Sequence, residues 1–86
     1  MRLMWLPTGW EDYLHWQATD RKILQRLNEV IRDSLRTPFE GIGKPEPLKG
    51  NLKGWWSRRI TQEHRLVYRV DGDVLIIMHC RFHYER

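Results

Sequence analysis

The region between residues 20 and 37 carries the clearest pattern of apolar and polar positions in the chain. Its apolar side chains recur at the i, i+3, i+4, i+7 spacing of one helical face, and charged side chains fill most of the other positions. This pattern predicts an amphipathic helix that Asp20 caps and that ends at Thr37, because the residue before Pro38 avoids the helical region. The apolar face consists of Ile23, Leu24, Leu27, Val30, Ile31 and Leu35.

A shorter helix is predicted just upstream, beginning after Thr8 and ending near Thr19. Thr8 and Glu11 fit a capping box, in which the hydroxyl accepts an N–H of the first turn and the carboxylate reaches back to the cap residue. The apolar run at residues 3–6 stops at Pro7, and it predicts a first or edge strand because proline cannot donate to the interior of a sheet.

The last third of the chain changes to the alternation that is typical of strands. Strands are predicted at residues 55–61, 64–70 and 74–82, with Asp71-Gly72 as the turn of the final hairpin. The glycine- and proline-containing stretch at residues 39–52 is predicted to be a loop, and long ordered loops in small domains are more often functional than incidental.

The order of these elements predicts an α+β fold of the type β-α-α-β-β-β. We expect a small antiparallel sheet with the two N-terminal helices packed on one face. The other face is then expected to be polar, cationic and open. A chain of 86 residues has room for one core, so residues 1–86 are predicted to form a single domain.

Composition narrows the possible functions. Fifteen Lys and Arg against eleven Asp and Glu give a net charge of +4, which favours a polyanionic partner such as nucleic acid, or an acidic protein. The single cysteine, Cys80, excludes an internal disulfide, and its apolar surroundings favour a buried, inert thiol. The start is interrupted too soon for a signal peptide, and no segment has the roughly 20 apolar residues that span a bilayer. A cytoplasmic protein is therefore expected.

Several polar side chains fit the cleavage of RNA without a metal. That reaction needs a base for the 2′-OH, cations for the phosphorane and an acid for the departing 5′-oxygen. Glu46, between two prolines that restrict its backbone, is the candidate base, and His83 is the candidate acid because an imidazole titrates near neutral pH. Taken singly, such residues are more often solvated surface groups. Candidates for contact with the substrate are Lys49, Arg59, Arg65 and Tyr84.

A metal site is not predicted. The histidines show neither the i, i+4 pairing on a helix nor the cysteine partners that are typical of zinc ligands. No glycine-rich phosphate loop is present either, since the stretch at residues 41–44 is too short to qualify.

Motifs along the whole chain resemble the YoeB family of bacterial toxins, within the RelE/YoeB group of ribosome-dependent mRNA endonucleases. The resemblance runs from residue 1 to Tyr84. Because five motifs occur in the same order and at matching spacing, the probability of a chance similarity is very small. These motifs are TPFEG at 37–41, GKPEPLK at 43–49, WSRRI at 56–60, EHRLVY at 63–68 and CRFHY at 80–84.

The resemblance implies a microbial-ribonuclease-like fold and cleavage of mRNA in the ribosomal A site, without a metal or other cofactor. It implies that Glu46 is the general base, His83 the general acid and Arg65 the cation that stabilises the phosphorane. The expected products are a 2′,3′-cyclic phosphate, or its opened form, and a 5′-hydroxyl. Supporting roles at the site fall to Lys49, Arg59, Glu63 and Tyr84, the last of which orients the substrate.

The resemblance also implies partners. These are a cognate antitoxin of the YefM type, the ribosome with its mRNA, operator DNA bound through the antitoxin complex, and a second copy in a homodimer; no membrane partner is expected. An alternative interpretation is a binding module that blocks translation or co-represses its operon without cutting RNA. The presence of Glu46, Arg65 and His83 together favours the enzyme.

Overall fold

The two helices form where the apolar periodicity predicts them. In the computed structural model, which describes residues 1–83, helix α1 spans Pro7–Thr19 and helix α2 spans Arg21–Arg36. The side chain of Asp20 accepts a hydrogen bond of 3.1 Å from the main-chain N–H of Ile23, which confirms the predicted cap. Within residues 1–83, neither helix nor any other combines the length and apolar composition needed to cross a bilayer.

The start of α1 differs from the prediction. The helix begins at Pro7, and its N-cap residue Leu6 makes no side-chain cap hydrogen bond. Proline suits the first helical position because its φ is already helical and it has no N–H to leave without a partner. Thr8 and Glu11 therefore both lie inside the helix, and the predicted capping box is wrong.

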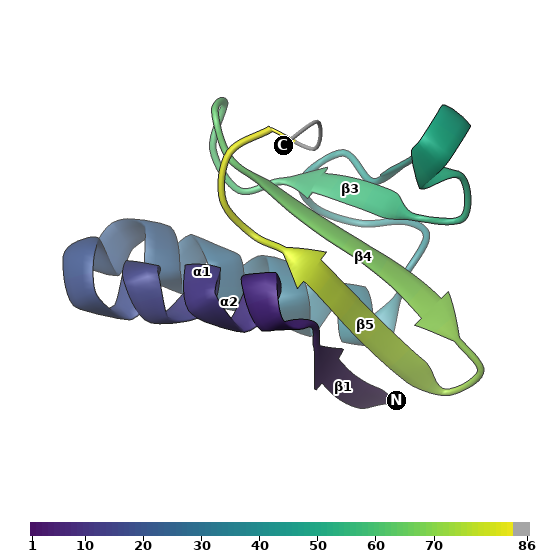
Figure 1. The fold of residues 1–86 in the computed structure, drawn as a ribbon, viewed down its shortest axis with the longest axis horizontal. Helices are drawn as coiled ribbons and strands as arrows, with labels where there is room; N and C mark the ends of the chain where they lie inside the picture. Colours follow the sequence, from purple (N-terminus) through teal and green to yellow (C-terminus); the bar gives the residue numbers. More distant parts are fainter. Residues whose placement is uncertain (84–86) are drawn as a thin grey trace.

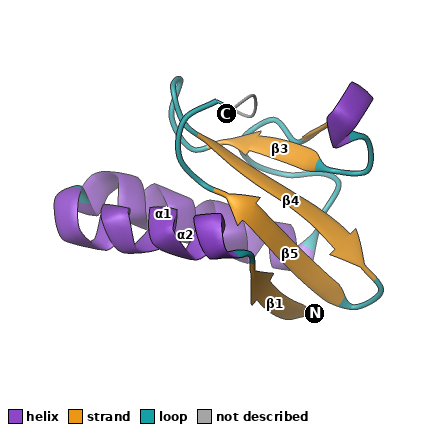
Figure 2. Cartoon of the chain, viewed as in Figure 1, coloured by secondary structure: helices purple, strands orange, loops and turns teal. Residues whose placement is uncertain are grey.

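A five-stranded sheet packs against the helices, in the order β1-β5-β4-β3-β2. The α+β class and the placement of both helices on one face confirm the prediction (Figures 1 and 2). The strands are β1 (Arg2–Trp5), β2 (Glu46–Pro47), β3 (Trp56–Arg59), β4 (Arg65–Asp71) and β5 (Val74–His79).

The sheet is mixed rather than wholly antiparallel. Strand β1 runs parallel to β5, with Leu3 opposite Leu75, whereas β2, β3, β4 and β5 form antiparallel pairs. The short β2 was not predicted, because two residues between prolines carry no alternation of apolar and polar positions.

Strand β5 ends at His79, three residues before the end predicted for it. The N–H of Cys80 donates to the Asp12 carboxylate of α1 at 3.1 Å, so the chain leaves the sheet at this point. The carbonyl of Cys80 accepts the indole N–H of Trp16 at 2.8 Å. The cysteine itself is completely buried, which confirms that part of its prediction.

Candidate active site

The face of the sheet that points away from the helices collects several predicted site residues. Arg58 of β3 reaches Asp33 on α2, so its neighbours Ser57 and Arg59 point to the opposite face. Glu46 of β2 lies directly opposite Ser57, and Arg65 of β4 lies directly opposite Arg59. Because directly opposed residues share a face of the sheet, Glu46, Arg59 and Arg65 lie on one face.

This face is less open than predicted. Val67 pairs with Ser57 on one side and with His79 on the other, and all three side chains are buried. Glu46 and Arg59 remain exposed. The expectation of an open, polar face is therefore wrong across the centre of the sheet, whereas the β2–β3 side is open and carries one acidic and one basic side chain.

Arg65 is held in place by the connection between β3 and β4. Its side chain is only 9% exposed. The guanidinium Nη1 donates to the carbonyl oxygens of Thr61 and Gln62 at 2.7 and 2.8 Å, with a longer contact of 3.2 Å to that of His64. A cation fixed before the reaction needs little reorganisation when charge develops on a phosphate beside it.

The C-terminal segment returns to the beginning of β4. The main-chain N–H of Phe82 donates to Nδ1 of His64 at 2.7 Å, and the carbonyl of Phe82 accepts the N–H of Arg65 at 2.9 Å. Figure 1 shows this yellow segment running from β5 toward the connection between β3 and β4. His83, the next residue, is therefore attached to the same end of the sheet as Arg65 and has an exposed side chain.

The loop that leads to Glu46 is attached to α2 by a buried arginine. Arg58 is 0% exposed, and its Nη1 lies 2.7 Å from Oδ2 of Asp33. Its Nε donates to the hydroxyl of Tyr68 at 2.9 Å. Its other contacts are with main-chain carbonyls of the loop, those of Thr37, Glu40 and Ile42.

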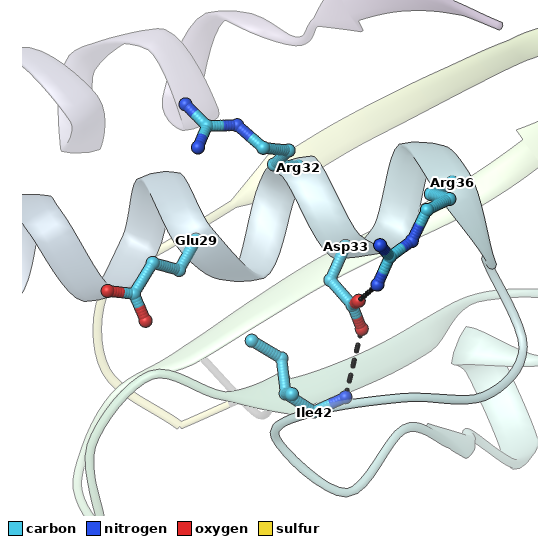
Figure 3. A pocket seen from close by; sticks show the side chains of 5 residues that line it. All are labelled: Glu29, Arg32, Asp33, Arg36 and Ile42. Atoms are coloured by element: carbon cyan, nitrogen blue, oxygen red, sulfur yellow. Dashed lines mark hydrogen bonds and ion pairs between the residues drawn. The ribbon is translucent and has the colours of Figure 1, made fainter.

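Asp33 supplies the negative charge that this arginine needs. The N–H of Ile42 donates to Oδ2 of Asp33 at 2.9 Å, and Arg36 contacts Oδ1 at 2.7 Å (Figure 3). The hydrogen bond from Ile42, followed by that from Arg58, lowers the pKa of Asp33 to about 2. The carboxylate is therefore ionised at every physiological pH.

Two glycines allow the loop to pass close to these groups. A Cβ on Gly41 would lie 2.0 Å from the Asp33 carboxylate, so only glycine fits there. The carbonyl of Gly43 accepts the N–H of Arg59 at 2.6 Å, which ties the loop to β3 just before Glu46 begins its pairing with the same strand.

Comparison with known proteins decides the family. The model of the YoeB-like toxins of bacterial type II toxin-antitoxin systems matches residues 5–84. The chain is 62% identical to toxin YoeB of Escherichia coli strain K12 over 84 residues, which cover 98% of this chain and 100% of the relative. This chain belongs to the YoeB family of toxins.

Solved structures agree with this assignment. A YoeB/ParE toxin from Agrobacterium tumefaciens superposes with a TM-score of 0.94 at 55% identity, covering 98% of this chain and 100% of that one. The toxin in a heterotetrameric YoeB-YefM complex from Staphylococcus aureus gives a TM-score of 0.89 at 45% identity, covering 98% of each chain. A YoeB dimer from the same organism gives 0.90 at 45% identity, with the same coverage.

The other predicted site residues of this YoeB-family chain lie at the margin of the assembled face. Lys49 is exposed and follows β2, directly before the short 3-10 helix Gly50–Leu52. The Glu63 side chain is 76% exposed, and its Oε1 lies 3.3 Å from Nε2 of His64. The predicted role of Tyr84 falls outside the described residues.

Sequence reasoning missed Asp33 and Arg58. The signal that could have found them is the adjacent pair Arg58-Arg59 within a strand, because successive residues point to opposite faces and one of the two had to face the helices. An arginine on the helical side then requires an acidic partner, and α2 offers Asp33 on its inner surface.

A hollow beside these residues is separate from the candidate site. It has a volume of about 380 Å³ and lies between α2 and the loop (Figure 3). No predicted site residue lines it. Its walls are Glu29, Arg32, Asp33, Arg36 and Ile42. Among residues 1–83, no group of three or more His, Cys, Asp or Glu side chains is arranged to hold a metal ion.

Proposed function

We propose that this YoeB-family toxin is a metal-independent endoribonuclease that cuts mRNA in the ribosomal A site. The observation that carries the proposal is the convergence of Glu46, Arg59 and Arg65 on one face of the sheet, with His83 attached beside Arg65 through Phe82. A carboxylate, fixed cations and an imidazole are the groups that attack by a 2′-OH requires.

The proposed reaction uses these groups in turn. Glu46 takes the proton of the 2′-OH, and the 2′-oxygen attacks the neighbouring phosphorus while Arg65 stabilises the phosphorane. His83 as imidazolium gives a proton to the departing 5′-oxygen, so that the products are a 2′,3′-cyclic phosphate and a 5′-hydroxyl. Glu46 ends protonated and His83 neutral. Substrate contacts are assigned to Lys49, Arg59, Glu63 and Tyr84.

Dependence on the ribosome follows from how exposed the site is. The side chains of Glu46, Arg59 and His83 all face solvent, so the protein alone does not enclose a flexible RNA strand. Alignment of reacting groups can supply about 7–11 kcal/mol of a barrier. A ribosome that holds the mRNA in the A site would supply much of that alignment.

We also propose a YefM-type antitoxin as partner, with operator DNA bound through the complex. The net charge of +4 suits an acidic protein segment, and the Staphylococcus aureus relative is found in a YoeB-YefM complex. A homodimer is proposed on the strength of the dimer of that same relative. The proposed location is the cytoplasm, where the ribosomes are.

The test is cleavage of a defined mRNA by the purified protein, with and without programmed ribosomes, followed by mapping of the new 5′ ends. We expect cuts at A-site codons that require ribosomes and that disappear in His83→Gln. Tight ribosome binding without any cut by the wild-type protein would instead assign the chain to the class of binding modules.

A further inference from the structure

His64 has no part in the proposed chemistry, yet it lies where β4 meets the C-terminal segment. Its side chain is 10% exposed. The ring packs edge-on against Trp16 of α1, with centroids 4.7 Å apart, and lies 5.8 Å from the ring of Phe82. The surrounding aromatic rings fix both the position and the plane of the imidazole.

The partners of its two ring nitrogens define a single tautomer. Nδ1 accepts the N–H of Phe82, so Nδ1 carries no proton. The ring proton is therefore on Nε2, which faces the carboxylate of Glu63 at 3.3 Å. The imidazole is neutral in this arrangement and acts as an acceptor toward the C-terminal segment.

Phe82 has an unfavourable backbone conformation that hydrogen bonds from its neighbours must stabilise. Its φ is +64°, in the left-handed region that non-glycine residues rarely adopt. The main chain of Phe82 makes one hydrogen bond to His64 and one to Arg65, and together these hold the turn. The geometry of this turn therefore sets where the main chain of His83, the next residue, lies.

We propose that His64 is a positioning residue whose Nδ1 holds the N–H of Phe82 and thereby directs His83 toward the phosphate beside Arg65. The assignment rests on the proposed function, in which His83 is the general acid. His64 itself touches neither the RNA nor the reacting atoms.

The arrangement makes the turn sensitive to acid. Burial lowers the pKa of His64, the Glu63 carboxylate raises it, and Arg81, His15 and Arg65 lower it further. These groups come from α1, from the β3–β4 connection, from β4 and from the C-terminal segment. The neutral acceptor form therefore dominates at neutral pH, and protonation of Nδ1 in acid removes the acceptor from Phe82.

Two matched variants test the proposal. His64→Phe keeps an aromatic ring against Trp16 but has no acceptor, whereas His64→Asn loses the ring and keeps a carbonyl oxygen near the position of Nδ1. We expect His64→Phe to lower kcat on programmed ribosomes by at least about tenfold, as part of the roughly 10²–10⁴-fold that a general acid supplies. KM should stay within about threefold. His64→Asn should recover most of the lost kcat.

An NMR measurement gives a readout that does not depend on cleavage. In the wild-type protein the Phe82 amide should be protected from exchange, and its shift should follow the titration of the His64 ring. Protection should be lost in His64→Phe and kept in His64→Asn, with unchanged circular dichroism in both. An unprotected Phe82 amide in the wild type, or normal kcat in His64→Phe after protection is lost, overturns the proposal.

The two readouts separate the possible failures. If the wild-type protein cuts no mRNA, the proposed function fails, whatever the Phe82 amide shows. If it cuts mRNA and both His64 variants are equally slow, the ring packing rather than the Nδ1 acceptor matters, and the positioning role is wrong.

Discussion

Two segments of the candidate site are attached to the core in different ways. The loop that leads to Glu46 is attached by Arg58, which is fully buried and contacts Asp33, Tyr68 and three main-chain carbonyls. The turn just before His83 is held at Phe82, whose main chain donates one hydrogen bond to a histidine ring and accepts one from the Arg65 main chain.

The two attachments differ in whether a group that forms their hydrogen bonds changes its protonation near neutral pH. A guanidinium stays charged at every physiological pH, and the pKa of its partner Asp33 is about 2, so the Arg58 contacts do not change near neutrality. The contact with His64 requires an unprotonated Nδ1. The proposed base thus has a pH-independent support, and the proposed acid has one that acid can weaken.

The largest expected effect comes from removing the stronger support. Arg58→Ala leaves a void and strips hydrogen bonds from the loop carbonyls, and we expect the free energy of unfolding to fall by about 3 kcal/mol or more. Urea denaturation measures it. The control is Arg21→Ala at the start of α2, where the arginine is exposed and the urea midpoint should barely move. Equal shifts in the two variants would show that the buried contacts are unimportant.

The next effect concerns the groups that the two segments carry. Glu46→Gln should slow cleavage on programmed ribosomes by at least about 100-fold, the usual scale for losing a general base. Because the Glu46 side chain is exposed, its urea midpoint should stay at the wild-type value. His83→Gln should lose activity to a similar degree. Near-normal rates in both variants would contradict the assignment of Glu46 as general base and His83 as general acid.

The smallest effect is a dependence of stability on pH, which sharpens the comparison. Since the folded-state pKa of His64 is lowered, its contribution to stability is present above its ordinary value of 6.5 and is lost as the pH falls below it. We expect the urea midpoint to fall between pH 7.5 and 5.5 in the wild type, and to fall less in His64→Asn.

Asp33 provides the contrast over the same range. Its folded-state pKa of about 2 lies below the ordinary 3.8, so its contribution is complete above pH 3.8 and is lost only as the pH falls toward 2. Asp33→Asn should therefore lower the urea midpoint by the same amount at pH 7.5 and 5.5. A shift that grows or shrinks between these two values would contradict the pH-independence of the Arg58 contacts.

Prediction from the sequence succeeded where the signal is local. The helix α2 and its Asp20 cap follow from spacing within one segment, and the three C-terminal strands follow from alternation and a strong turn. It failed where two signals competed within a few residues, as at Pro7 and Thr8, where the proline rather than the threonine begins the helix. The end of β5 was missed because Asp12, distant in the sequence, takes the N–H of Cys80.

The candidate site shows the same division. Glu46, Arg65 and His83 were selected from residue type and from the resemblance to the YoeB family, and the register of β2, β3 and β4 then placed Glu46 and Arg65 on one face. Arg58 and His64 lie within the motifs that carry the resemblance, but no motif marked Asp33 as the partner of Arg58. Nor did any motif indicate the role of His64, which depends on where the chain turns after β5.

The sequence by itself determined the helices, the final hairpin and the set of reactive side chains, because periodicity and residue chemistry are properties of short segments. Alternation also determined that Arg58 and Arg59 point to opposite faces. Only the tertiary structure decided which of the two faces α2, and therefore which supports the loop and which joins the site. Only the tertiary structure brought Phe82 to His64, because a contact between residues far apart in the sequence depends on how the whole sheet packs against the helices.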